Sequence, residues 1–472
     1  MTDREEPGSE RAARVLARKS GDKAPAPARG SSDGAGSAAG ESGEDAPSHA
    51  PAADGAAAAA SAPSHVDPGP SPAAAAETEG GGIRMGPVLA FMLAWMALWW
   101  SILGALLAPV VPGSWLAVLA LALLAAAPLG PLARGFGGRA YPSARTRLWV
   151  LRPFWYVQLV LPLVAAAGLI GALLGLPFSA AGTAGRAAAA VAAAALALLA
   201  LAGYAGSRRL VVRRLDVLVD GLPAGLDGLR LAQISDLHVG PHTSRRFLER
   251  VASAVRDARP DLVASTGDQV DDYAADVAHF TAAFGEVTAP LGVFAIPGNH
   301  DVYAGWDAVR RGMEQAGMRV LVNDAVALER NGVRFWVAGT GDPAARHWSR
   351  GGAGTAVPDI ERTLAGIPAG ELTLVLAHNP ALWPALARRG ATLTLSGHTH
   401  HGQLSIPRLG WSLASPFLEH AMGVHRAGDS LLYVHPGTNF WGIPFRIGAL
   451  PEVTVLTLRP GALSDIVATR AA

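Results

Sequence analysis

Aspartate, histidine and asparagine residues gather in five short clusters in the second half of this 472-residue chain. The clusters are Asp236-Leu237-His238, Gly267-Asp268, Gly298-Asn299-His300-Asp301, Ala377-His378-Asn379 and Gly397-His398-Thr399-His400-His401. Carboxylates, amides and neutral imidazoles are ligands that suit divalent metal ions of borderline softness. Two such ions held about 3.5–4 Å apart can clamp a phosphoryl group and acidify a shared water. The residue types therefore predict a two-metal centre that acts on phosphate compounds.

The spacing within the clusters suits metal binding. On an extended segment Asp236 and His238 point to the same side, because strand side chains alternate with a period of two. His398 and His400 have the same spacing, and in a loop their imidazoles can diverge to separate ions. The glycines that open three of the clusters allow the backbone to turn sharply and to approach a metal closely.

Each cluster taken alone has a plainer interpretation. A lone Asp-x-His pair is more often a polar surface feature, and the motif Gly397–His400 is only moderately specific. All five clusters occur in this order, and each follows an apolar segment. We therefore interpret them together as one site.

The apolar segments before the clusters have the pattern of buried strands. They are Leu229–Ile234, Leu262–Ser265, Val293–Ile296, Leu372–Ala377 and Leu393–Leu395. In α/β sheets the loops beyond the carboxyl ends of the strands form the active site. Five polar loops at one sheet edge would bring the aspartate, histidine and asparagine side chains together.

The sequence around these strands predicts the rest of an α/β domain. Val211–Val219 is expected to join the sheet as an early strand, and Asn331-Gly332 is a two-residue hairpin signal. Helical patterns fall near Arg245–Ala258, Asp276–Glu286 and Trp306–Ala316. The predicted domain covers residues 210–472, which is long enough to bury a sizeable core.

The region before this domain predicts membrane-spanning helices. Residues 85–133 contain no Asp, Glu, Lys or Arg, and further charge-free windows cover residues 153–185 and 187–207. Because a span needs about 20 apolar residues, four helices are expected, at 87–111, 113–133, 153–176 and 187–207. Buried helices of a soluble domain are the alternative, but no soluble core accounts for so long a charge-free run. The fourth span has the weakest signal, because alanine supplies most of it.

Composition limits the classes of partner and site. Half of the residues are hydrophobic and only 16% are charged, which is unusually apolar. The net charge of +1 gives no argument for a nucleic-acid partner, and none is expected. The absence of cysteine excludes disulfides and thiolate metal sites. Residues 1–82, rich in Ala, Gly, Ser and Pro, are predicted to be disordered because they offer little apolar surface to bury.

The ordered motifs resemble the calcineurin-like metallophosphoesterase superfamily. They are Asp-x-His at Asp236, Gly-Asp-x-x-Asp at Gly267, Gly-Asn-His-Asp at Gly298, Ala-His-Asn-Pro at Ala377 and Gly-His-Thr-His at Gly397. The likeness covers Leu229 to Leu458. The segments Ile234–His238, His401–Gln403 and Ile443–Arg446 are similar to the bacterial membrane-associated branch of the YkuE and YaeI proteins. The resemblance implies a four-layer αββα sandwich, here preceded by an all-α transmembrane region.

The resemblance also implies a role for each motif residue. One metal would bind Asp236, His238, Asp268 and His400, and the other would share Asp268 and add Asn299, His378 and His398. His300 would contact the phosphate and protonate the leaving oxygen, with Asp301 orienting it. Asp271 and His401 are expected beside the ligands, and Arg446 is expected to contact a substrate anion or, equally, to form a surface salt bridge. The two divalent ions would be Mn, Fe, Zn or Ni, because the ligand types do not select among them.

These expectations combine into a membrane-anchored hydrolase of a phosphate ester or pyrophosphate bond, with metal-activated water as the nucleophile. The membrane-associated branch favours a lipid-linked substrate of the UDP-diacylglucosamine or phospholipid type, and a soluble phosphodiester is the alternative. A metal-dependent membrane sensor without turnover is the alternative of another class, and the intact His300 argues against it. The expected partners are the lipid bilayer and the phosphate-containing substrate, and the oligomeric state stays open.

The arginines predict how the chain is oriented in a bacterial inner membrane. Between spans two and three lie Arg134, Arg139, Arg145, Arg147 and Arg152, and after span four lie Arg208, Arg209, Arg213 and Arg214. The connection between spans three and four contains only Arg186. Because loops rich in Lys and Arg stay cytoplasmic, the catalytic domain is predicted to be cytoplasmic.

Overall fold

The computed structural model describes residues 85–109, 113–136, 142–348, 351–462 and 464–468. Four of its helices are long and apolar enough to cross a membrane, namely Gly86–Leu107, Ser114–Leu132, Ala144–Phe178 and Ala181–Ser207. The expectation of four apolar helices before the α/β domain is confirmed. The third and fourth helices begin earlier than predicted, because helical structure continues past the arginines that bounded the charge-free windows. The predicted disordered tail lies outside the described residues.

Small residues let α6 (Arg152–Gly175) and α7 (Ala181–Ser207) pack closely. A Cβ added to Gly171 would come within 2.5 Å of the Ala188 Cβ, and one added to Gly175 within 2.8 Å of the Ala184 Cβ. Membrane helices associate through such close contacts, because burial in lipid gives them no hydrophobic driving force toward one another. The alanines that weaken the insertion signal of α7 therefore supply its packing surface.

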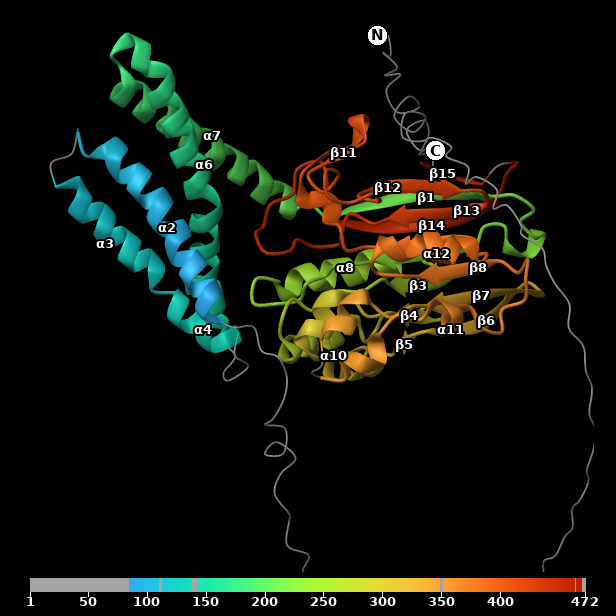
Figure 1. Cartoon of the computed structure of the whole chain (residues 1–472). Helices are drawn as coiled ribbons and strands as arrows, with labels where there is room; N and C mark the ends of the chain where they lie inside the picture. Colours follow the sequence, from blue (N-terminus) through green and yellow to red (C-terminus); the bar gives the residue numbers. More distant parts are fainter. Residues whose placement is uncertain (1–84, 110–112, 137–141, 349–350, 463, 469–472) are drawn as a thin grey trace, which may run out of the picture. The chain divides into compact units, whose positions relative to one another are not determined.

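The remainder of the described chain is built around two large sheets (Figure 1). The first has the order β15-β1-β14-β2-β3-β4-β5 and the second β12-β13-β9-β8-β7-β6. The first contains β1 (Val211–Val219), β2 (Arg230–Ile234), β3 (Leu262–Ser265), β4 (Val293–Ala295), β5 (Arg319–Val320), β14 (Glu452–Pro460) and β15 (Asp465–Ala468). The second contains β6 (Asp324–Arg330), β7 (Val333–Gly339), β8 (Thr373–Leu376), β9 (Leu393–Ser396), β12 (Gly423–Ala427) and β13 (Ser430–Val434).

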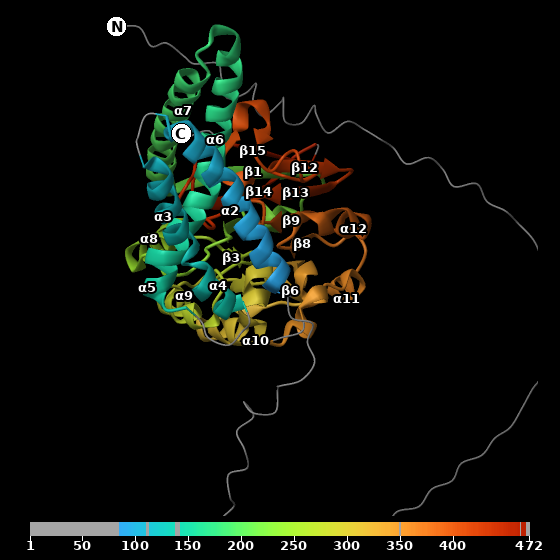
Figure 2. The ribbon, with the colours of Figure 1, turned by 60° about the vertical axis from the view of Figure 1, so that its left-hand side comes forward.

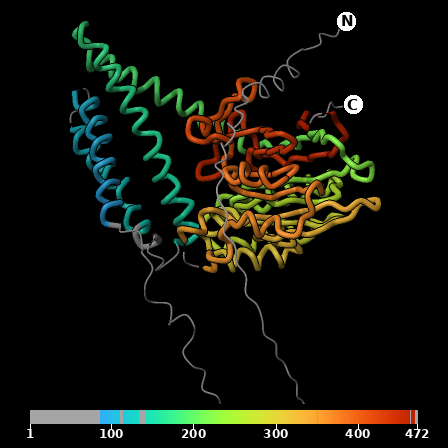
Figure 3. Tube along the Cα trace, turned by 45° about the vertical axis from the view of Figure 1, so that its right-hand side comes forward, coloured from blue at the N-terminus to red at the C-terminus, as the bar shows by residue number. Residues whose placement is uncertain are grey.

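Parallel pairing at the centre of each sheet sets the direction of the loops. The strands β2, β3 and β4 are parallel neighbours, and so are β7, β8 and β9. Late in the chain β14 inserts between β1 and β2, where Leu456 pairs with both Leu215 and Leu231. Figure 3 shows these green and red segments side by side. The domain therefore closes only when its first and last strands meet.

The two sheets pack face to face, and helices cover their outer faces. Leu231 and Leu456 of the first sheet share a buried cluster with Leu376 and Leu395 of the second. A second cluster joins the first sheet to α8 (Arg245–Asp257), α9 (Val277–Phe284) and α10 (Asn299–Gln315). A third joins the second sheet to α11 (Ile360–Leu364) and α12 (Trp383–Arg388) (Figure 2). The layers are helix, sheet, sheet and helix, so the predicted αββα sandwich is confirmed.

The five apolar segments predicted as strands are strands, with ends shifted by one residue or less. The helix predicted near Trp306 begins earlier, at Asn299, and has a break at Gly305, where φ is 117°. Its first turn is stable because the Asp301 carboxylate accepts a hydrogen bond from the Gly298 amide. Part of the predicted site is therefore helical rather than in a loop.

Candidate metal centre

The five polar clusters follow β2, β3 and β4 of the first sheet and β8 and β9 of the second. Main-chain hydrogen bonds connect the loops, since the Asp236 amide donates to the Gly267 carbonyl at 3.0 Å and the Gly397 amide to the His378 carbonyl at 3.1 Å. The His398 amide crosses from one sheet to the other and donates to Asp236 Oδ1 at 2.9 Å. The loops form one connected edge.

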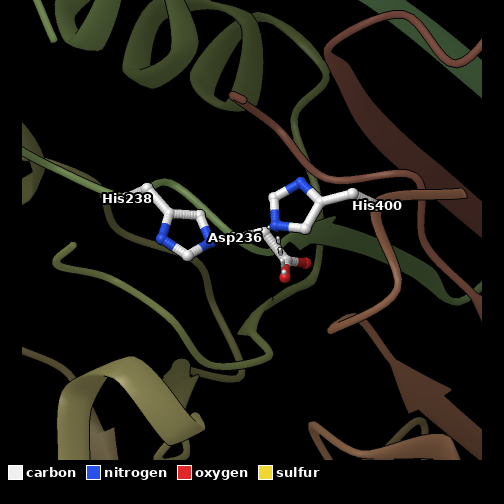
Figure 4. Close-up of side chains that lie close together, drawn as sticks. All are labelled: Asp236, His238 and His400. Carbon is white, nitrogen blue, oxygen red and sulfur yellow. Dashed lines mark hydrogen bonds and ion pairs between the residues drawn. The ribbon is translucent and has the colours of Figure 1, made fainter. Parts of the chain in front are cut away.

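The first group of candidate ligands consists of Asp236, His238 and His400. One ligand atom from each lies within 4.8 Å of the others, and all three side chains are buried. The two Nε2 atoms lie 2.9 Å apart, and His400 Nε2 is 3.3 Å from Asp236 Oδ1. In Figure 4 both imidazole rings lie close to the Asp236 carboxylate. The side chains converge from β2 and β9, which belong to different sheets.

These atoms fit a divalent cation. Only one proton can lie between His238 Nε2 and His400 Nε2, although both nitrogens face the same small space. Asp236 Oδ2 is buried and has no hydrogen-bond partner among the described residues. An unpaired buried carboxylate is costly unless a positive charge compensates it. Imidazole nitrogen and carboxylate oxygen together suit a borderline transition-metal ion or zinc.

The second group consists of Asp268, Asn299, His378 and His398. His378 Nε2 lies 3.2 Å from Asp268 Oδ2 and 3.3 Å from Asn299 Oδ1. His398 Nδ1 lies 2.8 Å from the same Asn299 oxygen. The Nδ1–H of His378 donates to the Thr266 carbonyl at 2.7 Å, so Nε2 is the ring nitrogen that faces Asp268 and Asn299 and that would bind a metal.

Asp268 is shared between the two groups. Its Oδ2 lies 3.5 Å from His238 Nε2 and 3.2 Å from His378 Nε2. Its Oδ1 accepts a hydrogen bond from the His300 amide at 2.8 Å. Burial alone would raise the pKa of Asp268, but His378 and His300 hold it well below the usual range of a carboxyl. A charged carboxylate therefore stands between the two sets of imidazoles.

The backbone at the site is strained. Positive φ angles occur at five non-glycine members of the two groups, namely Asp236, His238, Asp268, His398 and His400, with φ between 42° and 70°. A left-handed non-glycine residue costs on the order of 1–3 kcal/mol, and such residues cluster at functional sites. Aspartate and histidine tolerate this region better than most residues. The surrounding packing must therefore hold these side chains in place at a cost in stability.

Two of the motif glycines are required by close approach. A Cβ on Gly298 would lie 2.1 Å from Asp268 Oδ1, and one on Gly397 would lie 2.3 Å from Asp236 Oδ2. Any larger residue would push the carboxylates out of position. The glycines were predicted to allow a close approach of the backbone, and in the structure the backbone at both positions lies against a ligand carboxylate.

Comparison with known proteins identifies the domain. The profile of the calcineurin-like phosphoesterase family matches residues 229–402. This segment is a calcineurin-like phosphoesterase domain. It contains the five strand ends and all seven candidate ligands described above, and it ends before the C-terminal strands of the sandwich.

Three relatives are similar to this chain. A Danio rerio transmembrane protein with metallophosphoesterase domain is 34% identical over 255 residues, which are 52% of this chain and 56% of that protein. A metallophosphoesterase of Helicobacter pylori (strain J99) is 30% identical over 54% of this chain and 66% of its own length. The metallophosphoesterase YkuE of Bacillus subtilis is 29% identical over 50% and 82%. The match covers little more than half the length of the vertebrate relatives.

His300 lies beside the first group of candidate ligands, and its side chain is mostly buried. Its Nδ1 is 2.7 Å from the Asp271 carbonyl and 3.1 Å from Asp272 Oδ1. Its ring meets the His238 ring edge-on, with centroids 4.7 Å apart. Burial lowers the pKa of His300, but Asp268 and then Asp272 outweigh it and raise the pKa to about 10. The ring is therefore held by the loop after β3 and carries a proton at neutral pH.

Asp301 differs from its expected role of orienting His300. Its carboxylate accepts hydrogen bonds from the amides of Gly298 and Gln269 at 2.9 Å and of Val270 at 3.2 Å. These bonds fasten the loop after β4 to the loop after β3. The group that orients the His300 ring in the described structure is Asp272, together with the Asp271 carbonyl.

Asp271 lies beside the ligands, as expected. Its Oδ1 is 3.4 Å from His238 Nδ1, the nitrogen that points away from the first group. A carboxylate at that position fixes the ring and makes its other nitrogen a better ligand.

The expectation that Arg446 contacts a substrate anion is wrong. Its side chain is fully buried and donates to the carbonyls of His400 at 3.0 Å and Pro436 at 2.5 Å. Its guanidinium also lies 2.8 Å from His400 Nδ1. Burial, and then Arg446, hold the pKa of His400 well below its usual range, so the ring is uncharged. Arg446 supports a candidate ligand instead of meeting substrate.

His401 turns away from the site. Its ring is buried, and its Nε2–H donates to the Val434 carbonyl at 2.9 Å. The side chain therefore anchors the loop after β9 to β13, and its place beside His400 in the sequence does not bring it to a ligand position.

Two acidic residues near the centre were missed from the sequence. Asp272 follows the predicted Asp271 directly, and nothing in the spacing distinguishes the two. Asp342 follows β7 as the other clusters follow their strands, and its carboxyl is almost completely buried. Burial raises the pKa of Asp342 to about 6, against the opposing effect of His378. The other loops were located as polar residues that directly follow a buried strand. The same rule applied to β7 would have included Asp342.

Replacing Asp268 with alanine should remove bound metal more severely than any other single ligand change. One carboxylate faces both groups, so its loss leaves the positive charge of both ions poorly compensated. Metal content of the full-length protein, purified in detergent with Mn and then dialysed, measures the effect. Asp429→Ala, in the exposed turn between β12 and β13, is the matched control and should keep its metal. An Asp268 variant with full metal content would contradict the shared-ligand assignment.

Proposed function

We propose that this protein is a membrane-anchored phosphoesterase that uses two divalent ions to hydrolyse a phosphate ester or pyrophosphate bond. The observation that carries the proposal is the position of Asp268 Oδ2, within 3.5 Å of imidazoles from both ligand groups. A carboxylate in that position suits a bridge between two cations. The match to the calcineurin-like phosphoesterase profile supports the same reaction class.

The proposed ligands divide as the two groups do. Asp236, His238 and His400 would hold one ion with Asp268, and Asn299, His378 and His398 would hold the other with the same carboxylate. When bound, two such ions polarise phosphoryl oxygens and lower the pKa of a bound water. The mixed nitrogen and oxygen set suits Mn, Fe, Zn or Ni.

His300 is the proposed general acid. Its raised pKa keeps a proton on the ring at neutral pH, and the Asp271 carbonyl and Asp272 carboxylate occupy Nδ1, so Nε2–H is the group left to donate. A leaving-group oxygen that is protonated as its bond to phosphorus breaks departs as a neutral alcohol, or as a phosphate with one negative charge fewer. A sensor without turnover would have no use for a cationic imidazole beside the ligands, which favours the enzyme over that alternative.

The substrate proposed is lipid-linked, because the connection between helix and domain is short. Helix α7 ends at Ser207 and β1 begins at Val211. The Arg446 amide donates to the Gly203 carbonyl of α7 at 2.9 Å, which adds a second tie. Arginines near an anionic leaflet each add about 1 kcal/mol of attraction. A site held near the headgroups meets amphiphilic phosphates at a high effective concentration. The same position does not raise the concentration of soluble esters.

His300→Ala should keep its metal and lose turnover by about 10²–10⁴-fold, the usual contribution of a general acid. Hydrolysis of aryl phosphodiesters and nucleotide-diphospho lipids by the detergent-purified full-length protein with Mn measures turnover. His279→Ala, an exposed histidine on α9, should leave both metal and turnover unchanged. An empty His300 variant would make that residue a ligand, and an active one would remove its role as acid.

Full-length protein in vesicles should prefer a long-chain substrate in the same bilayer to a short-chain analogue with the same headgroup. We expect kcat/KM at least about tenfold higher for the long-chain compound, because the shared bilayer raises its effective concentration. Equal values in vesicles and in detergent would favour the soluble-ester alternative, in which the helices only localise the enzyme.

The catalytic domain should lie on the cytoplasmic face of a bacterial inner membrane. Arg145, Arg147 and Arg152 lie at the start of the third helix, before its charge-free stretch, and four arginines follow the fourth, so the positive-inside rule favours this orientation. A cytoplasm-dependent reporter fused to the C-terminus should be active, and a periplasm-dependent one inactive. The reverse pattern would mean that one of the four helices does not span.

A further inference from the structure

An apolar excursion extends from the phosphoesterase domain beside the metal centre. It comprises Ser405–Leu418, with the short pair β10 (Ser405–Ile406) and β11 (Trp411–Ser412) at its base. Six of its large apolar side chains are exposed, namely Ile406, Leu409, Trp411, Leu413, Phe417 and Leu418. Phe417 is 82% exposed and Leu409 61%. Figure 1 shows the segment with β11 standing away from the sheets.

The exposure is concentrated in this one segment. Among the described residues of the domain after Leu210, the other exposed large hydrophobics are Val212, Tyr303 and Trp441. Single exposed apolar residues are ordinary on a soluble surface, whereas a contiguous patch marks an interaction site. Fourteen consecutive residues therefore carry six of the nine exposed large hydrophobic side chains in the described part of the domain.

The base of the excursion is tied to the last membrane-capable helix. The Ser405 amide donates to the Ile447 carbonyl at 2.8 Å. The amide of the preceding residue, Arg446, donates to the Gly203 carbonyl of α7 at 2.9 Å. The Phe445 ring also packs against Gly203, where an added Cβ would lie 2.2 Å from the ring. The excursion thus starts from a segment that is docked on the end of α7.

The composition of the excursion suits the boundary between lipid headgroups and acyl chains. Arg408 is its only charged residue, and it contains no Asp or Glu. Tryptophan favours this boundary, because its ring is apolar and its N–H is polar. A basic side chain next to exposed leucine and phenylalanine suits the negative surface of a bilayer with anionic lipids.

We propose that Ser405–Leu418 inserts into the headgroup and acyl-chain boundary of the bilayer that contains the four helices. The occupant of the apolar surface is lipid, and Leu409 and Phe417 are its deepest contacts. The metal centre is then held at a fixed distance from the lipid surface, because His400 lies five residues before Ser405 and the Gln403 side chain bonds the Trp441 main chain at 2.9 and 3.0 Å. The proposal concerns the bilayer contact and holds whether the substrate is a lipid or a soluble ester.

The absence of cysteine from the sequence makes the test direct. Leu409→Cys and Phe417→Cys, each labelled with an environment-sensitive fluorophore, report on their surroundings in the full-length protein. The protein is reconstituted in vesicles of phosphatidylethanolamine and phosphatidylglycerol, with and without brominated acyl chains. Glu329→Cys, exposed on β6 close to the Asn331-Gly332 hairpin, is the matched control at the opposite ends of the strands. Metal content confirms that each labelled protein is folded.

We expect a blue-shifted emission at positions 409 and 417 and quenching by brominated lipid at least about twofold stronger than at position 329. Equal, weak quenching at all three positions would overturn the proposal, because the excursion would then lie in water. Protection from aqueous iodide without quenching by brominated lipid would also overturn it, because protein and not lipid would cover the segment.

Discussion

The buried charge of Asp268 is the constraint on which the rest of the domain depends. A carboxylate in a water-free interior costs several kcal/mol unless positive charge and hydrogen bonds compensate it. Imidazoles from β2 and from β8 lie within 3.5 Å of its Oδ2, and the His300 amide donates to its Oδ1. No single loop supplies all of these groups. The residues that compensate this charge must come from both sheets, so the site exists only when the sandwich is closed.

Closing the sandwich imposes costs that other residues offset. Left-handed backbone at Asp236 and Asp268 is strained, and two loops approach so closely that only glycine fits at Gly298 and Gly397. Asp301 stabilises this arrangement by accepting three main-chain amides from two loops. Arg446 holds the other side of the site by donating hydrogen bonds to the main-chain carbonyls of His400, Pro436 and Ala449. Both side chains are occupied by main-chain groups inside the domain, which explains why neither is available to contact a substrate.

The membrane region and the phosphoesterase domain meet through glycine and aromatic residues and through an ion pair between Arg147 and Asp276 at 2.6 Å. Gly203 of α7 accommodates the Phe445 ring, and the Arg446 amide bonds its carbonyl, so the segment that supports His400 also contacts the last apolar helix. Elsewhere in the same helix, Ala184 and Ala188 pack against glycines of α6. The alanines of this helix therefore serve its packing, since close contact between backbones is what holds membrane helices together.

The sequence by itself determined the strands, the four apolar helices and the residues gathered at the sheet edge. These follow from local properties, because burial of Leu262–Ser265 or a 49-residue window without charge can be read from consecutive residues. The partner of each polar group was decided only by the tertiary structure. Asp301 and Asp272 are equally plausible partners of His300 in the sequence. In the structure the first turn of α10 directs the Asp301 carboxylate to main-chain amides, and Asp272 is the residue beside the His300 ring. The burial of Arg446 and the exposure of Ser405–Leu418 could not be predicted from the sequence for the same reason. Whether an arginine is buried or a leucine exposed depends on strands that are distant in the chain, and no local pattern records which of them will cover it.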